Sequence, residues 1–155
     1  MKRDSPRLVE RLTPTTVARP WGSEETIVRT DDYSGKILRY KAGQAGGLQY
    51  HVLKDETFLL LEGECILRHG NGTGFRGEPL LWETVMRPGD AFRFPPFAVH
   101  QVQAITDCMG IEFSTPHEDD RVRVEDRYGV EAVEGAGPTT WDIDATGYHT
   151  RKAAE

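Results

Sequence analysis

Residues 43–56 have the sequence GQAGGLQYHVLKDE, and residues 89–100 have the sequence GDAFRFPPFAVH. Both stretches combine glycine-containing turns with the apolar and aromatic residues that favour strands. In a strand, side chains two residues apart point to the same face. Gln49 and His51 therefore face one side of their strand, while Tyr50 faces the other. The side chains of Gln49 and His51 can both reach one point in the interior.

Two further donors are expected to arrive from neighbouring strands. Glu56 begins the next predicted strand after a tight connection, and His100 begins another after the rigid Pro95-Pro96 turn. An amide oxygen, two imidazoles and a carboxylate suit Zn, Mn, Fe, Co or Ni, and they leave positions open for water and substrate. The sequence therefore predicts one divalent metal ion held by Gln49, His51, Glu56 and His100.

Short apolar runs continue through the chain up to residue 116, separated by many of its 16 glycines and nine prolines. We expect strands at 25–29, 35–41, 47–52, 57–61, 65–69, 82–86, 91–94, 100–104 and 109–114. Glycine-rich residues 70–79 predict a long hairpin loop. This density of short strands predicts an all-β sandwich or barrel.

The chain of 155 residues is the usual size of one domain. We expect an N-terminal arm over 1–18, one barrel domain over 19–130 and a flexible tail over 131–155, where Gly, Pro, Thr and Ala are frequent. The charged stretch 117–128 predicts either a short helix or an extended arm.

Composition excludes several classes of function. The net charge of -6 comes without a dense Lys/Arg stripe, which argues against nucleic acid as a partner. No apolar run approaches the roughly 18 residues that a membrane span requires, and no secretory signal is evident, so we expect a cytoplasmic protein that does not bind membranes. Cys65 and Cys108 lie in apolar strand-like runs and predict two reduced, buried thiols.

The two stretches resemble the two signature motifs of the cupin superfamily, with Gln49 in the place of the usual first histidine. The resemblance implies a double-stranded β-helix, also called a jelly-roll barrel, around the metal.

A second resemblance points to the mannose-6-phosphate isomerase domain of type II phosphomannose isomerases and covers about residues 18–130. Its matching pieces are Arg19-Pro20-Trp21-Gly22, Leu48-Gln49-Tyr50-His51 with Glu56, Ile111-Glu112-Phe113, and Glu118-Asp119-Asp120 with Arg123, Asp126, Tyr128 and Gly129. It implies a metal-dependent isomerase that interconverts aldose and ketose phosphates through an enediolate.

The chain also departs from that family. Val52 and Leu53 replace histidines that are frequent there, Thr57-Phe58 replaces a His-Trp pair, and Lys54 replaces an arginine. The nucleotidyltransferase half is absent from the given sequence. The resemblance therefore leaves the sugar open, with mannose 6-phosphate as one candidate.

Isomerisation needs a base that moves a proton between adjacent carbons. The candidates are Glu56 if its metal contact is loose, Glu112 on the last predicted strand, or a hydroxide on the metal. Lys54 lies beside the ligands and could neutralise an enediolate or a phosphate; the alternative is a solvated loop lysine.

Substrate contacts are expected from residues near the barrel mouth. Arg19, Lys36, Arg39 and Arg123 are candidate phosphate donors, but Lys36 and Arg39 lie on opposite faces of one strand, so at most one points inward. Trp21 and Tyr50 are candidates for stacking on a sugar ring.

The acidic segment Glu118-Asp119-Asp120 is either a solvated charge run or a partner for Arg121, Arg123 or Arg127 of a neighbouring segment. The second alternative would pin the C-terminal arm over the barrel or across a dimer. The cupin resemblance implies a homodimer.

Two other functions remain open at this stage. One is a mononuclear iron dioxygenase acting on a small organic substrate, because the same ligand set can present iron to oxygen. The other is a non-catalytic cupin that binds a metal or a small molecule.

Overall fold

The computed structural model describes residues 7–73, 79–125, 141–143 and 149–151. The regular elements in these residues are all strands, so the all-β prediction is confirmed. Nothing in this part of the chain forms a helix long and apolar enough to cross a membrane.

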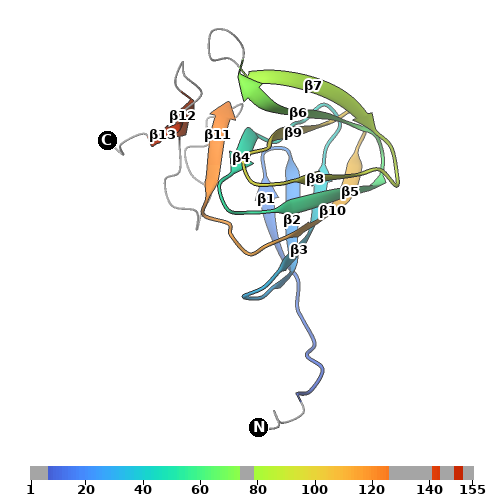
Figure 1. Ribbon diagram of the computed structural model, residues 1–155. Coiled ribbons are helices and arrows are strands. Elements are labelled where there is room, and N and C mark those ends of the chain that lie inside the picture. Colours follow the sequence, from blue (N-terminus) through green and yellow to red (C-terminus); the bar gives the residue numbers. More distant parts are fainter. Residues whose placement is uncertain (1–6, 74–78, 126–140, 144–148, 152–155) are drawn as a thin grey trace.

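Two antiparallel sheets face each other across the interior (Figure 1). The six-stranded sheet has the order β1 (Thr15–Arg19), β2 (Gly22–Arg29), β3 (Ser34–Tyr40), β10 (Cys108–Ser114), β5 (Glu56–Glu62) and β8 (Ala91–Phe94). The five-stranded sheet has the order β11 (Arg121–Glu125), β4 (Leu48–His51), β9 (Val99–Ala104), β6 (Cys65–Thr73) and β7 (Pro79–Met86). Strands β12 (Trp141–Ile143) and β13 (His149–Arg151) form a separate pair.

Each of the two motif stretches crosses from one sheet to the other. The first leaves β4 in the five-stranded sheet and enters β5 in the six-stranded sheet. The second leaves β8 in the six-stranded sheet and enters β9 beside β4. Because both crossings lie at one end of the facing sheets, side chains from both sheets meet there.

The predicted strands correspond to β2 through β10, and the differences lie at the ends of the sheets. Strand β1 falls in the expected N-terminal arm; its side chains are almost all exposed, so it lacks the alternation that reveals a half-buried strand. Strand β11 falls where a short helix or arm was expected, because its alternating Arg and Val residues stand inside a charged run.

Strand β6 extends through Thr73 into the expected hairpin loop, because its pairing with β7 continues past a register shift at 69–72. The rest of that loop, 74–78, lies outside the described residues, as do Asp126, Arg127, Tyr128, Gly129 and, apart from β12 and β13, the expected tail.

The main apolar core fills the space between the sheets, and a smaller cluster lies on the other face of β4. The core contains Leu38, Tyr40, Phe58, Leu60, Cys65, Leu67, Met86, Phe94, Val102, Ala104 and Cys108. The smaller cluster contains Leu48, Tyr50, Val99 and Val122. Cys65 and Cys108 are free and buried, which confirms the prediction of reduced core thiols.

Gly110 gives a test of this packing. A Cβ atom there would overlap the Phe58 ring and lie 2.8 Å from the Leu59 carbonyl oxygen. We expect Gly110→Ala to lower the free energy of unfolding by about 1–3 kcal/mol, since overpacking forces the sheet to shift. Gly46→Ala is the control, because its nearest neighbour, the Tyr40 ring, is 3.8 Å away. Equal urea midpoints for the two variants would contradict the prediction.

Candidate metal centre

Three side chains from both sheets converge where the motif stretches cross. His51 ends β4, Glu56 begins β5 and His100 lies on β9, and all three are buried. Glu56 Oε1 lies 2.7 Å from His100 Nε2 and 3.8 Å from His51 Nε2. Each residue offers a ligand atom within 4.8 Å of the others. Ligands about 2.0–2.2 Å from one ion lie at comparable separations, so the three fit a shared divalent cation.

Both imidazole rings are held by their second nitrogen. His51 Nδ1 lies 2.8 Å from Asp120 Oδ1, and His100 Nδ1 lies 2.9 Å from the Ala98 carbonyl oxygen. If each Nδ1 donates its hydrogen, each Nε2 presents a lone pair to the cluster, the arrangement that orients metal-binding histidines. The buried His51 Nε2 atom has no hydrogen-bond partner among the described residues.

Burial lowers the pKa of His51, outweighing the hydrogen bond to Asp120 and the Glu56 charge, which both raise it. The neutral imidazole that a metal needs is therefore favoured. Burial would raise the pKa of Glu56, but in the metal-free site the hydrogen bond between His100 Nε2 and Glu56 and the charge of Lys54 bring it well below the usual range. A bound metal would take the place of the hydrogen that His100 and Glu56 share. Two nitrogen lone pairs and an ionised carboxylate oxygen form a donor set suited to Zn, Mn, Fe, Co or Ni.

Gln49, the fourth predicted ligand, pairs in register with His100 on β9. It lines the same pocket as Glu56 and His100. The Gln49 side chain therefore lies beside the other candidate ligands. Coordination of the metal by its amide oxygen stays a prediction.

Asp120 belongs to this site, although the sequence analysis expected it in a solvated charge run or paired with an arginine. Besides His51, its carboxylate accepts hydrogen bonds from the backbone N–H groups of Leu53 at 2.6 Å and Lys54 at 2.7 Å. Burial opposes its ionisation, but these hydrogen bonds lower the pKa of Asp120 to about 2. Asp120 is therefore paired rather than solvated. Of the expected arginine partners, Arg127 lies outside the described residues.

Glu118 in the same segment pairs with Lys36 at 2.7 Å and with Arg29 at 3.4 Å. These contacts hold the segment leading into β11 against the body of the two sheets. A local sequence pattern could not have revealed the contacts of this acidic segment. The contact between Asp120 and His51, for example, joins residues 69 positions apart.

Lys54 is buried rather than solvated. Its Nζ atom lies 2.8 Å from Glu56 Oε2 and 2.6 Å from Glu112 Oε1, so it bridges two carboxylates. Burial would lower the pKa of Lys54, but the Glu112 and Glu56 charges raise it above its ordinary value. The lysine is therefore charged and acts on the site through Glu56 and Glu112.

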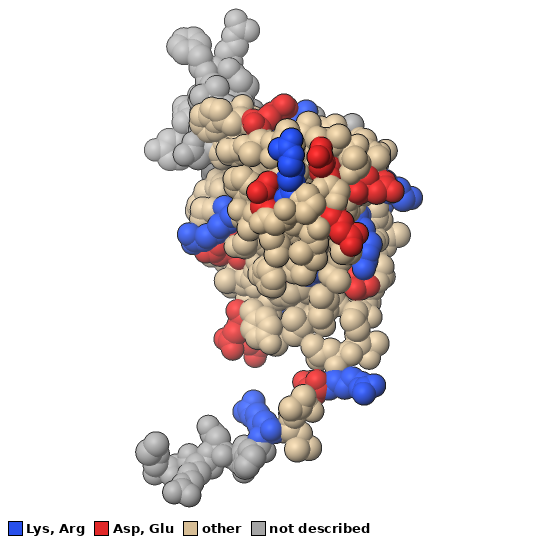
Figure 2. All heavy atoms as spheres, turned by 90° about the vertical axis from the view of Figure 1, so that its right-hand side faces the viewer, with Lys and Arg blue, Asp and Glu red and all other residues tan. Residues whose placement is uncertain are grey.

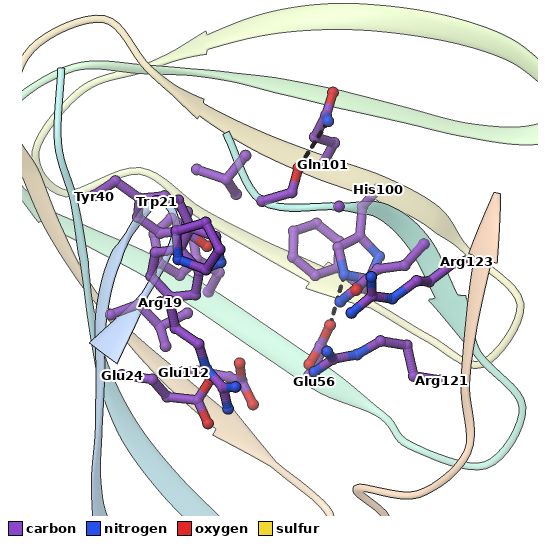
Figure 3. A pocket seen from close by; sticks show the side chains of 18 residues that line it. Arg19, Trp21, Glu24, Tyr40, Glu56, His100, Gln101, Glu112, Arg121 and Arg123 are labelled. Atoms are coloured by element: carbon purple, nitrogen blue, oxygen red, sulfur yellow. Dashed lines mark hydrogen bonds and ion pairs between the residues drawn. The ribbon is translucent and has the colours of Figure 1, made fainter. Parts of the chain in front are cut away.

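One pocket opens beside the cluster, and Figure 3 shows its walls. Glu56 and His100 lie on one side, while Arg19, Glu24 and Glu112 lie across from them. Trp21 also lines the pocket and stacks on Tyr40, with ring centroids 4.2 Å apart. The predicted site residues that line it are Arg19, Trp21, Gln49, Glu56, His100, Glu112 and Arg123.

Three predicted substrate contacts lie away from this wall. Lys36 points inward but is buried between Glu24 and Glu118, at 2.9 and 2.7 Å. Arg39, on the opposite face of β3, is half exposed and pairs with Glu25 at 3.7 Å. Tyr50 belongs to the smaller apolar cluster, because odd and even positions of β4 face opposite ways. Arg121, which was not predicted as a substrate contact, does line the pocket.

Asp120→Asn tests the role of the orienting carboxylate. We expect the metal affinity to fall about 10- to 100-fold, because an amide holds the His51 ring less well. Competition with a chromogenic chelator measures the affinity. Asp119→Asn, at the exposed neighbouring position, is the control. Equal affinities for both variants would show that Asp120 does not orient the ligand.

No protein-family model matches the chain, and no curated protein matches it in sequence. Similarity to solved structures is nevertheless extensive. The capsular polysaccharide assembling protein CapF from Staphylococcus aureus has 19% identity and a TM-score of 0.61 over 74% of this chain and 35% of its own. The chain thus spans about a third of the length of CapF.

Two smaller proteins are similar over most of their length. KdgF from Halomonas sp. has 18% identity and a TM-score of 0.56 over 69% of this chain and 90% of its own. A protein with a double-stranded β-helix domain from Klebsiella pneumoniae has 18% identity and a TM-score of 0.54, over 65% and 77%. The predicted double-stranded β-helix fold is therefore confirmed. Membership of the cupin superfamily stays a prediction. The narrower resemblance to mannose-6-phosphate isomerases stays a prediction.

Proposed function

We propose that this cupin-fold protein is a metal-dependent isomerase or epimerase of a sugar or sugar phosphate that acts through an enediolate-type intermediate. The observation that carries the proposal is a second carboxylate, Glu112, which lines the pocket opposite the ligand cluster. A proton-transfer enzyme needs such a base near, but outside, the electrophilic centre.

Glu56 is a poor candidate for the base. One of its oxygens faces the two histidines, and the other is 2.8 Å from Lys54 Nζ. Glu112 is bonded to Lys54 through Oε1 alone and borders the pocket. We therefore assign proton transfer to Glu112, and assign Lys54 the role of holding both carboxylates in place.

In this proposal the substrate binds with its carbonyl and adjacent hydroxyl toward the ligand cluster. A divalent metal held by His51, Glu56 and His100 would polarise these oxygens and stabilise the negative charge of the enediolate. The Glu112 carboxylate takes the proton from the carbon next to the carbonyl, and the electron pair of that C–H bond forms the enediolate. For isomerisation, Glu112 then returns the proton to the former carbonyl carbon, while the proton of the adjacent hydroxyl moves to the former carbonyl oxygen and leaves a new carbonyl behind. For epimerisation, a second acid instead gives a proton to the opposite face of the original carbon, and Glu112 keeps the proton that it removed.

Glu112→Gln tests this assignment in metal-loaded protein. Solvent deuterium should enter the substrate carbon beside the carbonyl with wild-type protein, as followed by NMR over a panel of aldoses, ketoses and their phosphates. We expect the variant to retain its metal while exchange slows by about 100- to 10,000-fold. Absence of exchange across the panel would reject the isomerase; oxygen uptake by the iron-loaded protein would then favour a dioxygenase.

The proposal includes a homodimer. Strand β1 lies at the edge of the six-stranded sheet with exposed side chains, and an exposed edge can pair with a second copy. Sedimentation equilibrium tests this, and a monomer at micromolar concentration would reject it.

A further inference from the structure

Strand β11 places two arginines beside the predicted metal ligands. Arg121 and Arg123 are register partners of His51 and Gln49 on β4. Val122 between them is fully buried in the smaller apolar cluster, so the two arginines share the opposite face of the strand, the one that carries the ligands. Both line the pocket, and Figure 3 shows them extending from β11 toward Glu56 and His100.

At least one N–H donor of Arg121 has no acceptor among the described residues. Its buried Nε atom has no hydrogen-bond partner among the described residues. Across the pocket, Arg19 is held by Glu24 at a distance of 3.4 Å. A buried donor without a partner is costly, so a ligand that accepts a hydrogen bond from it gains affinity.

The charges of the site point to the kind of ligand. Cations and carboxylates are equal in number among the charged residues that line the pocket and the buried or half-buried groups behind it, with the more exposed Arg29 beside Glu118 left out: Arg19, Lys36, Lys54, Arg121 and Arg123 against Glu24, Glu56, Glu112, Glu118 and Asp120. A divalent cation on the ligand cluster would therefore leave two positive charges in excess. An anionic substrate would neutralise that excess where the arginines offer donors.

We propose that Arg121 and Arg123, with Arg19 opposite, bind an anionic group of the substrate next to the metal. The inference rests on the proposed function for its metal, and it narrows the substrate to a sugar that carries a carboxylate or a phosphate. The planar guanidinium of arginine bonds either group through paired N–H donors. Neutral sugars offer hydroxyl oxygens as acceptors, but they would not neutralise the excess positive charge.

Binding of small anions tests the proposal without knowledge of the substrate. Inorganic phosphate and malonate are titrated into zinc-loaded protein by calorimetry, for wild type, Arg121→Gln, Arg123→Gln and Arg87→Gln. Arg87 is exposed and pairs with Glu64, and neither residue lines the pocket, so Arg87 serves as the matched control. We expect each pocket variant to bind the preferred anion about tenfold or more weakly, and the control to bind it like wild type.

Arg121→Lys keeps the charge and protects the test against misfolding of the glutamine variant; it should bind more tightly than Arg121→Gln. Tighter wild-type binding of phosphate would indicate phosphate esters, and tighter binding of malonate would indicate sugar acids. Unchanged affinity in both glutamine variants, or no binding of either anion to wild type, would overturn the proposal. Zinc content, measured in each sample, separates this failure from failure of the metal site itself.

Discussion

Protein purified without a metal-affinity tag is expected to contain about one equivalent of a first-row divalent metal, and His51→Ala combined with His100→Ala is expected to lose nearly all of it. The double substitution removes both nitrogen donors and leaves Glu56 as the remaining member of the cluster. One carboxylate holds such ions weakly without imidazole partners. Elemental analysis by mass spectrometry measures the stoichiometry.

His69→Ala is the matched control for this loss. His69 is a partly buried histidine on β6, and its Nε2 atom lies 3.0 Å from the Thr84 hydroxyl rather than in the cluster. The control should keep wild-type metal content, and added metal should raise its thermal midpoint as it does for wild type. Wild-type protein that holds no metal and takes none up from added salts would reject the metal centre and, with it, the proposed isomerase.

The convergence of the candidate ligands could be predicted from sequence because their geometry is local. Gln49 and His51 share a strand face by simple alternation, and Glu56 follows after one short crossing. His100 needed only the second motif, since β9 pairs directly with β4. The short spacings within the two motif stretches were therefore enough to predict that these side chains lie close together.

The supporting shell was beyond sequence reasoning because its contacts join distant segments. Asp120 reaches His51, and Glu112 reaches Lys54 across 58 positions. Such contacts follow from strand order, and the position of β11 beside β4 was not evident from a charged run. The position of Arg121 in the pocket was missed for the same reason, and the two carboxylates that pair with Lys36 were not foreseen.

Lys54→Met is expected to lower the free energy of unfolding of the metal-free protein by about 3–5 kcal/mol, the range observed when one partner of a buried ion pair is removed. Lys54 is 3% exposed and is the common partner of Glu56 and Glu112. Methionine fills similar volume but leaves the buried Glu56 and the partly buried Glu112 without the cation that they share. Urea denaturation in the presence of a chelator measures the loss, and Lys41→Met, at an exposed position, should change stability by less than about 0.5 kcal/mol.

The origin of that loss can be separated from simple loss of packing by a double substitution. Glu112→Gln removes one of the two negative charges while keeping the shape of the side chain, so Lys54→Met should cost less in the Glu112→Gln background than in wild type. Bound metal should reduce the cost further, because it neutralises Glu56 from the other side. Lys54→Met could instead lower the free energy of unfolding by the same amount in metal-free wild type, in Glu112→Gln and in metal-loaded protein. The lysine would then contribute packing alone. In that case the charge of Lys54 would not hold the Glu112 carboxylate, and another group would have to position Glu112 for proton transfer.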